Sequence, residues 1–154
     1  MIREATRDGN RVRRPSSVVR LLAPWAPAVV CMIVIFWLSS QPDLPGPPGR
    51  LLNLLLKKGA HLTIYALLTL LYRSALVLTW AGGGTSRVSG RYDLVSMALS
   101  TLYAISDEWH QRLTPGRQPR LLDVLIDVAG ACLALILWHL AQRFHHRLDQ
   151  DRRE

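Results

Sequence analysis

The sequence predicts an all-α fold, an integral membrane bundle of four transmembrane helices with both termini in the cytoplasm. Two observations predict it. Apolar residues make up 49% of the chain and gather in long blocks, whereas a soluble amphipathic helix would alternate apolar and polar faces. The 19 Lys and Arg residues exceed the 11 Asp and Glu residues, and most of the basic residues lie in only some of the connecting segments. The apolar blocks exclude a small nucleic-acid-binding protein, the other class that a basic composition suggests.

Each apolar block predicts one helix. A helix needs about 20 mainly apolar residues to cross a bilayer core. The first and last blocks reach that length, although the last carries Asp123 and Asp127 near its start, and the two middle blocks reach it if their charged residues lie at the interface. The first block is too long for the apolar region of a signal peptide, so we expect a retained membrane anchor. The blocks are Leu21–Ser40, Gly59–Trp80, Leu94–Ser106 and Leu121–Leu140.

The remaining segments complete the predicted organisation. We expect a basic cytoplasmic tail at residues 1–20, a membrane domain at residues 21–142 and a cytoplasmic C-terminal tail at residues 143–154. Prolines in the first connection exclude helix there, glycines in the second predict a flexible loop, and Pro115-Gly116 marks a turn in the third.

The distribution of basic residues predicts the orientation. The two tails and the middle connection carry 13 of the 19 Lys and Arg residues. The positive-inside rule therefore places both termini in the cytoplasm of a multi-pass inner-membrane protein. Six basic residues remain for the outward segments, more than orientation alone favours, and they suggest an anionic ligand or partner carboxylates. They are Arg50, Lys57, Lys58, Arg112, Arg117 and Arg120.

Polar residues form a stripe on three of the four predicted helices. Successive helical residues are about 100° apart, so five polar side chains of the second helix fall within an arc of roughly 80°. Because the helices alternate in direction, the ionisable members of all three stripes should meet at the outer face. Such groups avoid lipid and turn toward the interior of a bundle. The stripes are Lys58, His61, Tyr65, Thr69 and Tyr72; Ser96, Ser100, Tyr103, Asp107 and Gln111; and Asp123, Asp127, Gly130 and Ala134.

These stripes predict a ligand-binding site, although salt bridges that only hold the helices in register would explain the same charges. Catalytic candidates are His61, Asp107 and Glu108. No cofactor is evident from a motif, but Asp123 and Asp127 offer oxygen ligands to a divalent cation. Cys31 and Cys132 form neither a metal-ligand pattern nor a disulfide framework. The full predicted binding set is Lys58, His61, Tyr65, Asp107, Glu108, Gln111, Arg117, Asp123 and Asp127.

The ordered motifs resemble the VanZ-like family over about residues 36–138. One departure is Asp127, where the family pattern leads us to expect asparagine in many members. The resemblance implies a small multi-helix membrane protein, and the family's namesake is associated with low-level resistance to the glycopeptide antibiotic teicoplanin. The matching pieces are Leu38-Ser39-Ser40-Gln41-Pro42, Lys58-x-x-His61-x-x-x-Tyr65, Asp107-Glu108-x-x-Gln111, Pro115-Gly116-Arg117 and Asp123-x-x-x-Asp127-x-x-Gly130.

Three functions remain open from the sequence, and all assume contact with membrane lipids. The favoured one is binding of an anionic envelope component or a glycopeptide antibiotic. The second is an envelope-lipid enzyme acting on a lipid-linked phosphate or sugar, with His61 and either Asp107 or Glu108 as acid and base. The third is a small proton-coupled transporter. Four helices would need to oligomerise to form one, and the sequence has no pair of broken helices of the kind that transporters use.

Overall fold

The computed structural model describes residues 17–41, 50–80, 89–114 and 120–152. Within these residues every regular element is helical. The elements in order are α1 (Ser17–Leu22), the 3-10 turn η1 (Ala23–Trp25), α2 (Ala26–Ser39), α3 (Arg50–Trp80), α4 (Ser89–Gln111) and α5 (Leu121–Asp151). The all-α prediction is therefore confirmed for the described residues. The predicted Pro-rich and Gly-rich connections and Arg117 lie mainly or wholly outside them.

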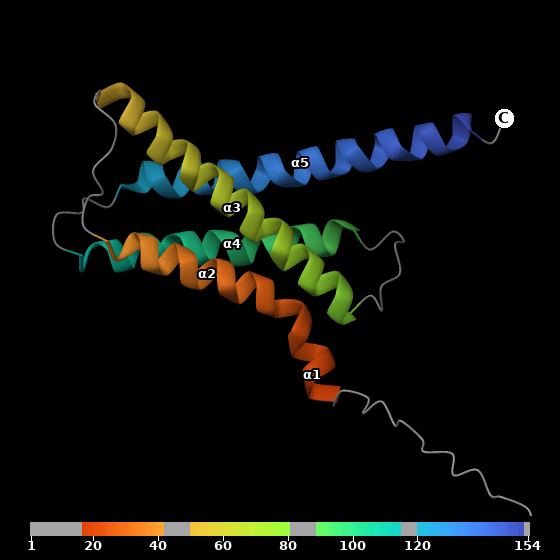
Figure 1. Cartoon of the computed structure of the whole chain (residues 1–154), viewed down its shortest axis with the longest axis horizontal. Coiled ribbons are helices and arrows are strands. Elements are labelled where there is room, and N and C mark those ends of the chain that lie inside the picture. The colour runs from red at the N-terminus through yellow and green to blue at the C-terminus, as the bar shows by residue number, and fades with distance from the viewer. Residues whose placement is uncertain (1–16, 42–49, 81–88, 115–119, 153–154) are drawn as a thin grey trace, which may run out of the picture.

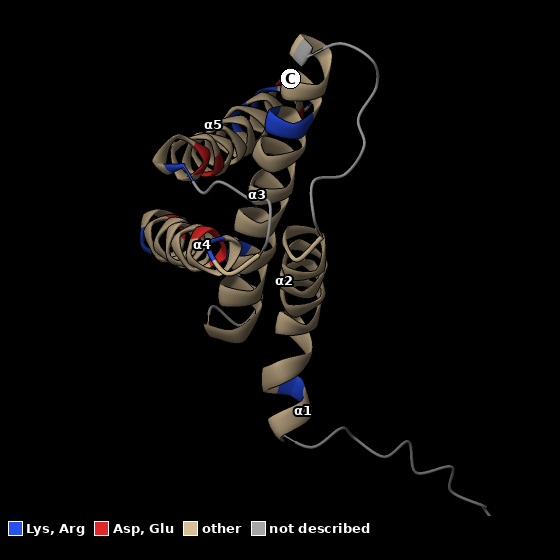
Figure 2. Ribbon diagram, turned by 90° about the vertical axis from the view of Figure 1, so that its left-hand side faces the viewer, with Lys and Arg blue, Asp and Glu red and all other residues tan. Residues whose placement is uncertain are grey.

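The long helices form one bundle in which α3 is central. Helix α3 contacts α2, α4 and α5, and its most extensive packing is against α5. It crosses the bundle obliquely (Figure 1), and the end-on view shows it between α2 on one side and both α4 and α5 on the other (Figure 2). The chain bends between α1 and α2, where Pro24 and Pro27 occupy first-turn positions. Proline suits a helix start but interrupts the preceding helix, which accounts for the bend.

Three of the described helical segments, not four, are long and apolar enough to cross a membrane. They are Val18–Ser39, Leu51–Trp80 and Leu121–Asp151. The prediction of four transmembrane helices is thus supported for three. Helix α4 differs because serines interrupt its apolar residues and both of its ends are charged, with Arg91 and Asp93 at one end and Asp107 and Glu108 at the other.

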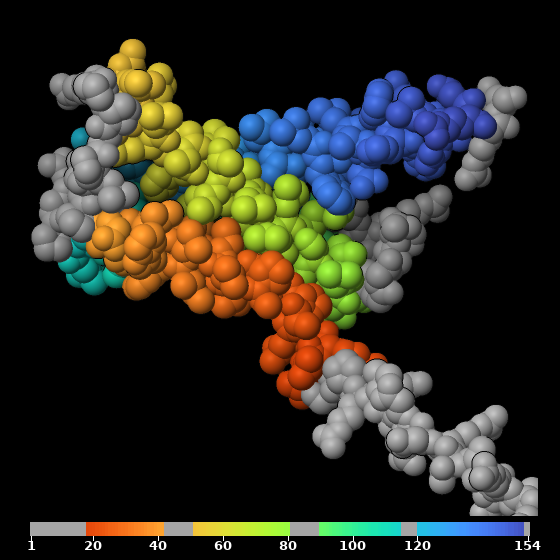
Figure 3. Space-filling model, in the orientation of Figure 1, coloured from red at the N-terminus to blue at the C-terminus, as the bar shows by residue number. Residues whose placement is uncertain are grey.

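Two helices are longer than their apolar blocks. Helix α3 begins at Arg50, about two and a half turns before the predicted start at Gly59. Helix α5 continues through most of the segment predicted as a C-terminal tail and ends at Asp151. Its last turns are exposed and extend away from the other helices (Figure 3).

The bundle has a mixed interior and an apolar surface, unlike a soluble protein. The interior contains an apolar cluster around Ile35, Tyr65 and Leu68, but also fully buried polar residues such as Thr69 and Ser96. The outer surface is apolar over most of the bundle, as contact with lipid tails requires. Large apolar residues that are each more than half exposed include Ile33, Phe36, Trp37, Leu102, Ile136 and Leu137.

Candidate functional site

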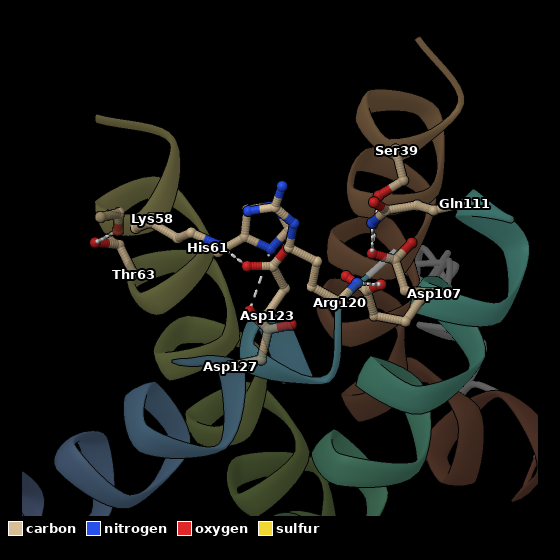
Figure 4. A network of polar contacts seen from close by, with 11 residues as sticks. Ser39, Lys58, His61, Thr63, Asp107, Gln111, Arg120, Asp123 and Asp127 are labelled. Carbon is tan, nitrogen blue, oxygen red and sulfur yellow. Dashed lines mark hydrogen bonds and ion pairs between the residues drawn. The ribbon is translucent and has the colours of Figure 1, made fainter. Parts of the chain in front are cut away.

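The predicted polar stripes meet at the end of the bundle where α2 and α4 finish and α3 and α5 begin. Figure 2 views this end and shows acidic residues on α4 and α5 near basic residues on α3. Figure 4 shows the network itself, with side chains from all four helices. We call this cluster the polar site. Its members are Ser39, Lys58, His61, Tyr65, Asp107, Glu108, Gln111, Arg120, Asp123 and Asp127.

Asp107 joins α2 to α4 inside the site. Its Oδ2 accepts a hydrogen bond of 2.9 Å from Ser39 Oγ and one of 3.0 Å from Gln111 Nε2. The residue is only 4% exposed, and its Oδ1 has no hydrogen-bond partner among the described residues. The Gln111 bond follows from helical spacing, since residues four apart lie on one face. One oxygen of this carboxylate is thus held by the fold and the other remains available.

His61 and Asp127 form the contact between α3 and α5. His61 Nδ1 lies 3.2 Å from Asp127 Oδ1, and the Asp127 side chain is 1% exposed whereas that of His61 is 28% exposed. A carboxylate at one ring nitrogen fixes the orientation and tautomer of a histidine. Nε2 of His61 has no hydrogen-bond partner among the described residues and is the nitrogen free to meet a ligand.

Two further contacts, one of Lys58 and one of Glu108, lie at the start of α5. Lys58 forms an ion pair with Asp123 in the first turn of α5. Glu108 Oε2 accepts a 3.0 Å hydrogen bond from the backbone nitrogen of Arg120, the residue that precedes α5. This bond ties the end of α4 to the start of α5. Arg120 is exposed, and its charge acts on Lys58, so two cations lie near each other at the edge of the site.

Tyr65 lies beneath these charges, completely buried. Its hydroxyl has no hydrogen-bond partner among the described residues, and the charges of Asp107, Asp127 and Glu108 all act on it. Deeper in the bundle the stripe continues with neutral groups: Thr69 donates a 2.8 Å hydrogen bond to Ser100. The ionisable part of the stripe is therefore confined to one end.

The structure brings together every described residue of the predicted binding set. Arg117 alone lies outside the described residues. Two partners were not in that set, namely Ser39 of α2 and the backbone of Arg120. His110 also contacts α2: its Nε2 lies 3.1 Å from Ser40 Oγ, and its ring stacks on Phe36 at 4.4 Å between ring centroids. Helical periodicity cannot find such partners because it assigns a face and not a contact.

A second polar cluster lies at the opposite end. Asp93 of α4 accepts a 2.6 Å hydrogen bond from Arg73 Nε of α3 and lies 2.8 Å from His139 Nε2 of α5. Arg73 also sits over the Trp138 ring, 5.0 Å from its centroid. Both side chains therefore tie their helices to α4.

The described residues contain no group of three or more His, Cys, Asp or Glu side chains arranged to hold a metal ion. Asp123 and Asp127, the carboxylates expected to bind a divalent cation, are each engaged with a basic side chain of α3. Cys31 and Cys132 are free thiols on different helices.

An all-helical bundle with apolar outer surfaces and ionisable groups buried at one end defines a multi-pass membrane protein with a polar interior site. A protein-family model described as VanZ/LLP1 matches residues 24–142, which contain α2, α3, α4 and the larger part of α5. The chain belongs to the VanZ/LLP1 family. No curated protein and no solved structure matches the chain.

Proposed function

We propose that this protein binds the polar head group of an envelope component, or a glycopeptide antibiotic of the teicoplanin type, in the polar site. The observation that carries the proposal is the burial of Asp107, Glu108 and Asp127 inside a bundle whose surface is apolar. Buried charges are costly, and well-packed apolar residues often stabilise a protein as well or better. A fold that needed only helix packing would not require three such carboxylates.

We also propose the membrane topology that this function needs. Helix α4 crosses the membrane as a fourth span because it packs along both α3 and α5, and its buried side carries Ser96, Ser100 and Asp107. Four spans in the inner membrane, with the basic tails in the cytoplasm, open the polar site toward the outside. An extracytoplasmic ligand would then reach it without crossing the bilayer.

The edge of the site supports an anionic part in the ligand. Lys58 and Arg120 bring two positive charges near each other, and Asp123 balances only one of them. A guanidinium suits a carboxylate or phosphate because it donates two parallel hydrogen bonds. Figure 3 shows the surface hollowed between the last turns of α2 and the first turns of α3, which gives a head group a route inward.

One observation favours an enzyme as the second candidate. His61 is oriented through Nδ1 by buried Asp127, which leaves Nε2 to exchange a proton with a bound molecule. The proposal would then be hydrolysis or transfer on a lipid-linked phosphate or sugar, with Asp107 or Glu108 as the second proton-exchanging group. Binding remains the better-supported function because the described residues place no nucleophile beside His61.

The test compares cells that lack the protein with cells that express the wild type, Glu108→Gln or His61→Ala. Teicoplanin bound to the cells and the envelope-lipid profile are both measured. We expect the wild type to raise the amount of antibiotic captured by the cells at an unchanged lipid profile and Glu108→Gln to abolish that effect. Asp149→Asn, an exposed carboxamide substitution at the far end of α5, is the matched control and should behave as wild type.

Two results would contradict binding as the function. Equal antibiotic capture with and without the protein, together with no lipid bound to the purified chain, would remove it. An envelope-lipid intermediate that changes in abundance with the wild type but not with His61→Ala would establish the enzyme in its place.

A further inference from the structure

Four buried polar atoms of the polar site have no hydrogen bond among the described residues, and only one of them, Asp123 Oδ1, is in an ion pair, with Lys58; the other three have neither kind of partner. These three are Asp107 Oδ1, Glu108 Oε1 and the Tyr65 hydroxyl oxygen. Their residues are 4%, 7% and 0% exposed, so water does not replace the missing protein partners easily. A buried polar atom without a hydrogen bond is costly, and native structures contain few of them. Three in one place indicate that a ligand supplies the hydrogen bonds.

These acceptors belong to one neighbourhood. Tyr65 comes from α3 and the two carboxylates come from consecutive positions of α4, yet both carboxylates act electrostatically on the Tyr65 hydroxyl and on each other. The second oxygen of each carboxylate is already bonded. Asp107 Oδ2 accepts a hydrogen bond from Ser39 Oγ, and Glu108 Oε2 accepts one from the backbone nitrogen of Arg120. The oxygens that remain free are therefore fixed in position before any ligand arrives.

The charge of this neighbourhood is negative. The two basic side chains that α3 contributes to the polar site, Lys58 and His61, are already engaged with Asp123 and Asp127, and Arg120 is exposed at the edge of the site. Asp107 and Glu108 accept hydrogen bonds only from uncharged donors among the described residues. An anion would be repelled from this inner part, whereas a cation with several N–H groups would be attracted.

We propose that the inner part of the polar site binds a primary ammonium group, the cationic half of a phosphoethanolamine-type head group whose phosphate lies at the Lys58 and Arg120 edge. An ammonium carries three donors and no acceptor, which matches three free acceptors. Asp107 Oδ1, Glu108 Oε1 and Tyr65 each receive one N–H. This inference rests on the proposed binding function and names the chemistry of its ligand. A trimethylated head group has the charge but lacks the donors.

The test uses the purified full chain in phosphatidylcholine nanodiscs, with thermal unfolding as the readout. Phosphatidylethanolamine is added to the bilayer in one arm, phosphatidylglycerol in a second, soluble phosphoethanolamine in a third and calcium chloride in a fourth. A ligand that binds only the folded protein raises the unfolding midpoint. We expect phosphatidylethanolamine to raise it, and phosphatidylglycerol and calcium to leave it near the phosphatidylcholine value.

Two variants and a matched control test the acceptors. Glu108→Gln and Tyr65→Phe should each raise the half-saturating fraction of phosphatidylethanolamine about tenfold or more, the usual scale for a hydrogen bond to a charged group. Tyr65→Phe should not lower the ligand-free midpoint, because it removes an unpartnered hydroxyl. Tyr72→Phe is the control, since its hydroxyl already donates to Met32 Sδ at 3.0 Å, away from the polar site.

Each outcome has a defined meaning. A shift with soluble phosphoethanolamine and none with the lipid would support the ammonium site and assign it a soluble ligand. Equal shifts with phosphatidylglycerol and phosphatidylethanolamine would overturn the ammonium site but leave the proposed function intact. A shift with calcium alone would also overturn it. No shift in any arm, together with unchanged antibiotic capture, would contradict both proposals.

Discussion

Gly130 permits the contact on which the polar site depends. It lies where α5 crosses α3. A Cβ atom at this position would overlap the carbonyl oxygen of Leu62 and lie 2.9 Å from its carbonyl carbon. Leu62 is adjacent to His61, and Gly130 lies one helical turn after Asp127. Close approach of the two backbones at this point therefore brings His61 and Asp127 together, as small residues do in other membrane helix pairs.

Gly130→Ala should destabilise the protein, because backbone atoms of α3 cannot yield as a flexible side chain would. We expect a loss of about 1–3 kcal/mol in the free energy of unfolding, typical of overpacking. Reversible unfolding in mixed detergent micelles measures it. Gly59→Ala is the matched control, since a Cβ there has nothing within 4 Å, and alanine favours a helix over glycine by roughly 1 kcal/mol. Equal losses for both variants would show that the crossing is not as tight as described.

Sequence reasoning at this scale identifies faces but not partners. The 3.6-residue period predicts that Lys58, His61 and Tyr65 share one side of a helix, and the structure places them so. The period cannot say that His61 contacts Asp127 whereas Lys58 contacts Asp123, because those pairings depend on the α3–α5 crossing. Asp93 was missed for the same reason. It lies in a segment predicted as a loop and gains its partners only through packing.

Helix α4 shows how a polar helix is held within an apolar bundle. Its polar side chains face inward at both ends, with Asp107 and Glu108 at the polar site and Asp93 at the opposite cluster. Membrane helices are recognised by high mean hydropathy. A helix whose polar face is buried by its neighbours has a lower mean hydropathy and does not meet that criterion. The proposal that α4 is a fourth span therefore rests on its packing against α3 and α5 and not on its composition.

Asp93→Ala should loosen α4 from both α3 and α5. It leaves the Arg73 guanidinium, whose side chain is only 13% exposed, without this carboxylate. Removing one partner of a largely buried ion pair costs about 3–5 kcal/mol, so a large drop in unfolding free energy is expected. The same unfolding assay applies, with Asp149→Ala at an exposed position of α5 as control. A loss below about 1 kcal/mol would mean that Arg73 reaches the interface and Asp93 is dispensable, as surface pairs usually are.

Helix boundaries were predicted less well than helix existence. The apolar blocks located all four long helices, but α3 starts well before its block and α5 ends well after its own. Charged residues such as Lys57 and Arg143 interrupt an apolar pattern without interrupting a helix, since both residue types are good helix formers. Apolar runs therefore define the part of a helix that suits lipid and not the helix itself.

The whole molecule has two chemically different ends. Helix α1 and the last turns of α5 lie toward the end that holds Arg73 and Asp93, and the polar site occupies the other (Figure 1). The excess of basic residues in the tails and the middle connection marks the first of these ends. The sequence predicted this separation because helices that alternate in direction return every second connection to the same side.

The central claim is that the polar site opens to the outside while the tails face the cytoplasm. Single cysteines report it directly in a Cys31→Ala, Cys132→Ala background. Leu113→Cys, at a position 75% exposed just beyond Gln111, marks the polar-site end, and Gln150→Cys marks the far end of α5. The measurement is labelling by a membrane-impermeant maleimide before and after cell lysis. We predict that Leu113→Cys reacts in intact cells and Gln150→Cys only after lysis; the reverse pattern, or labelling of both from one side, would contradict the account.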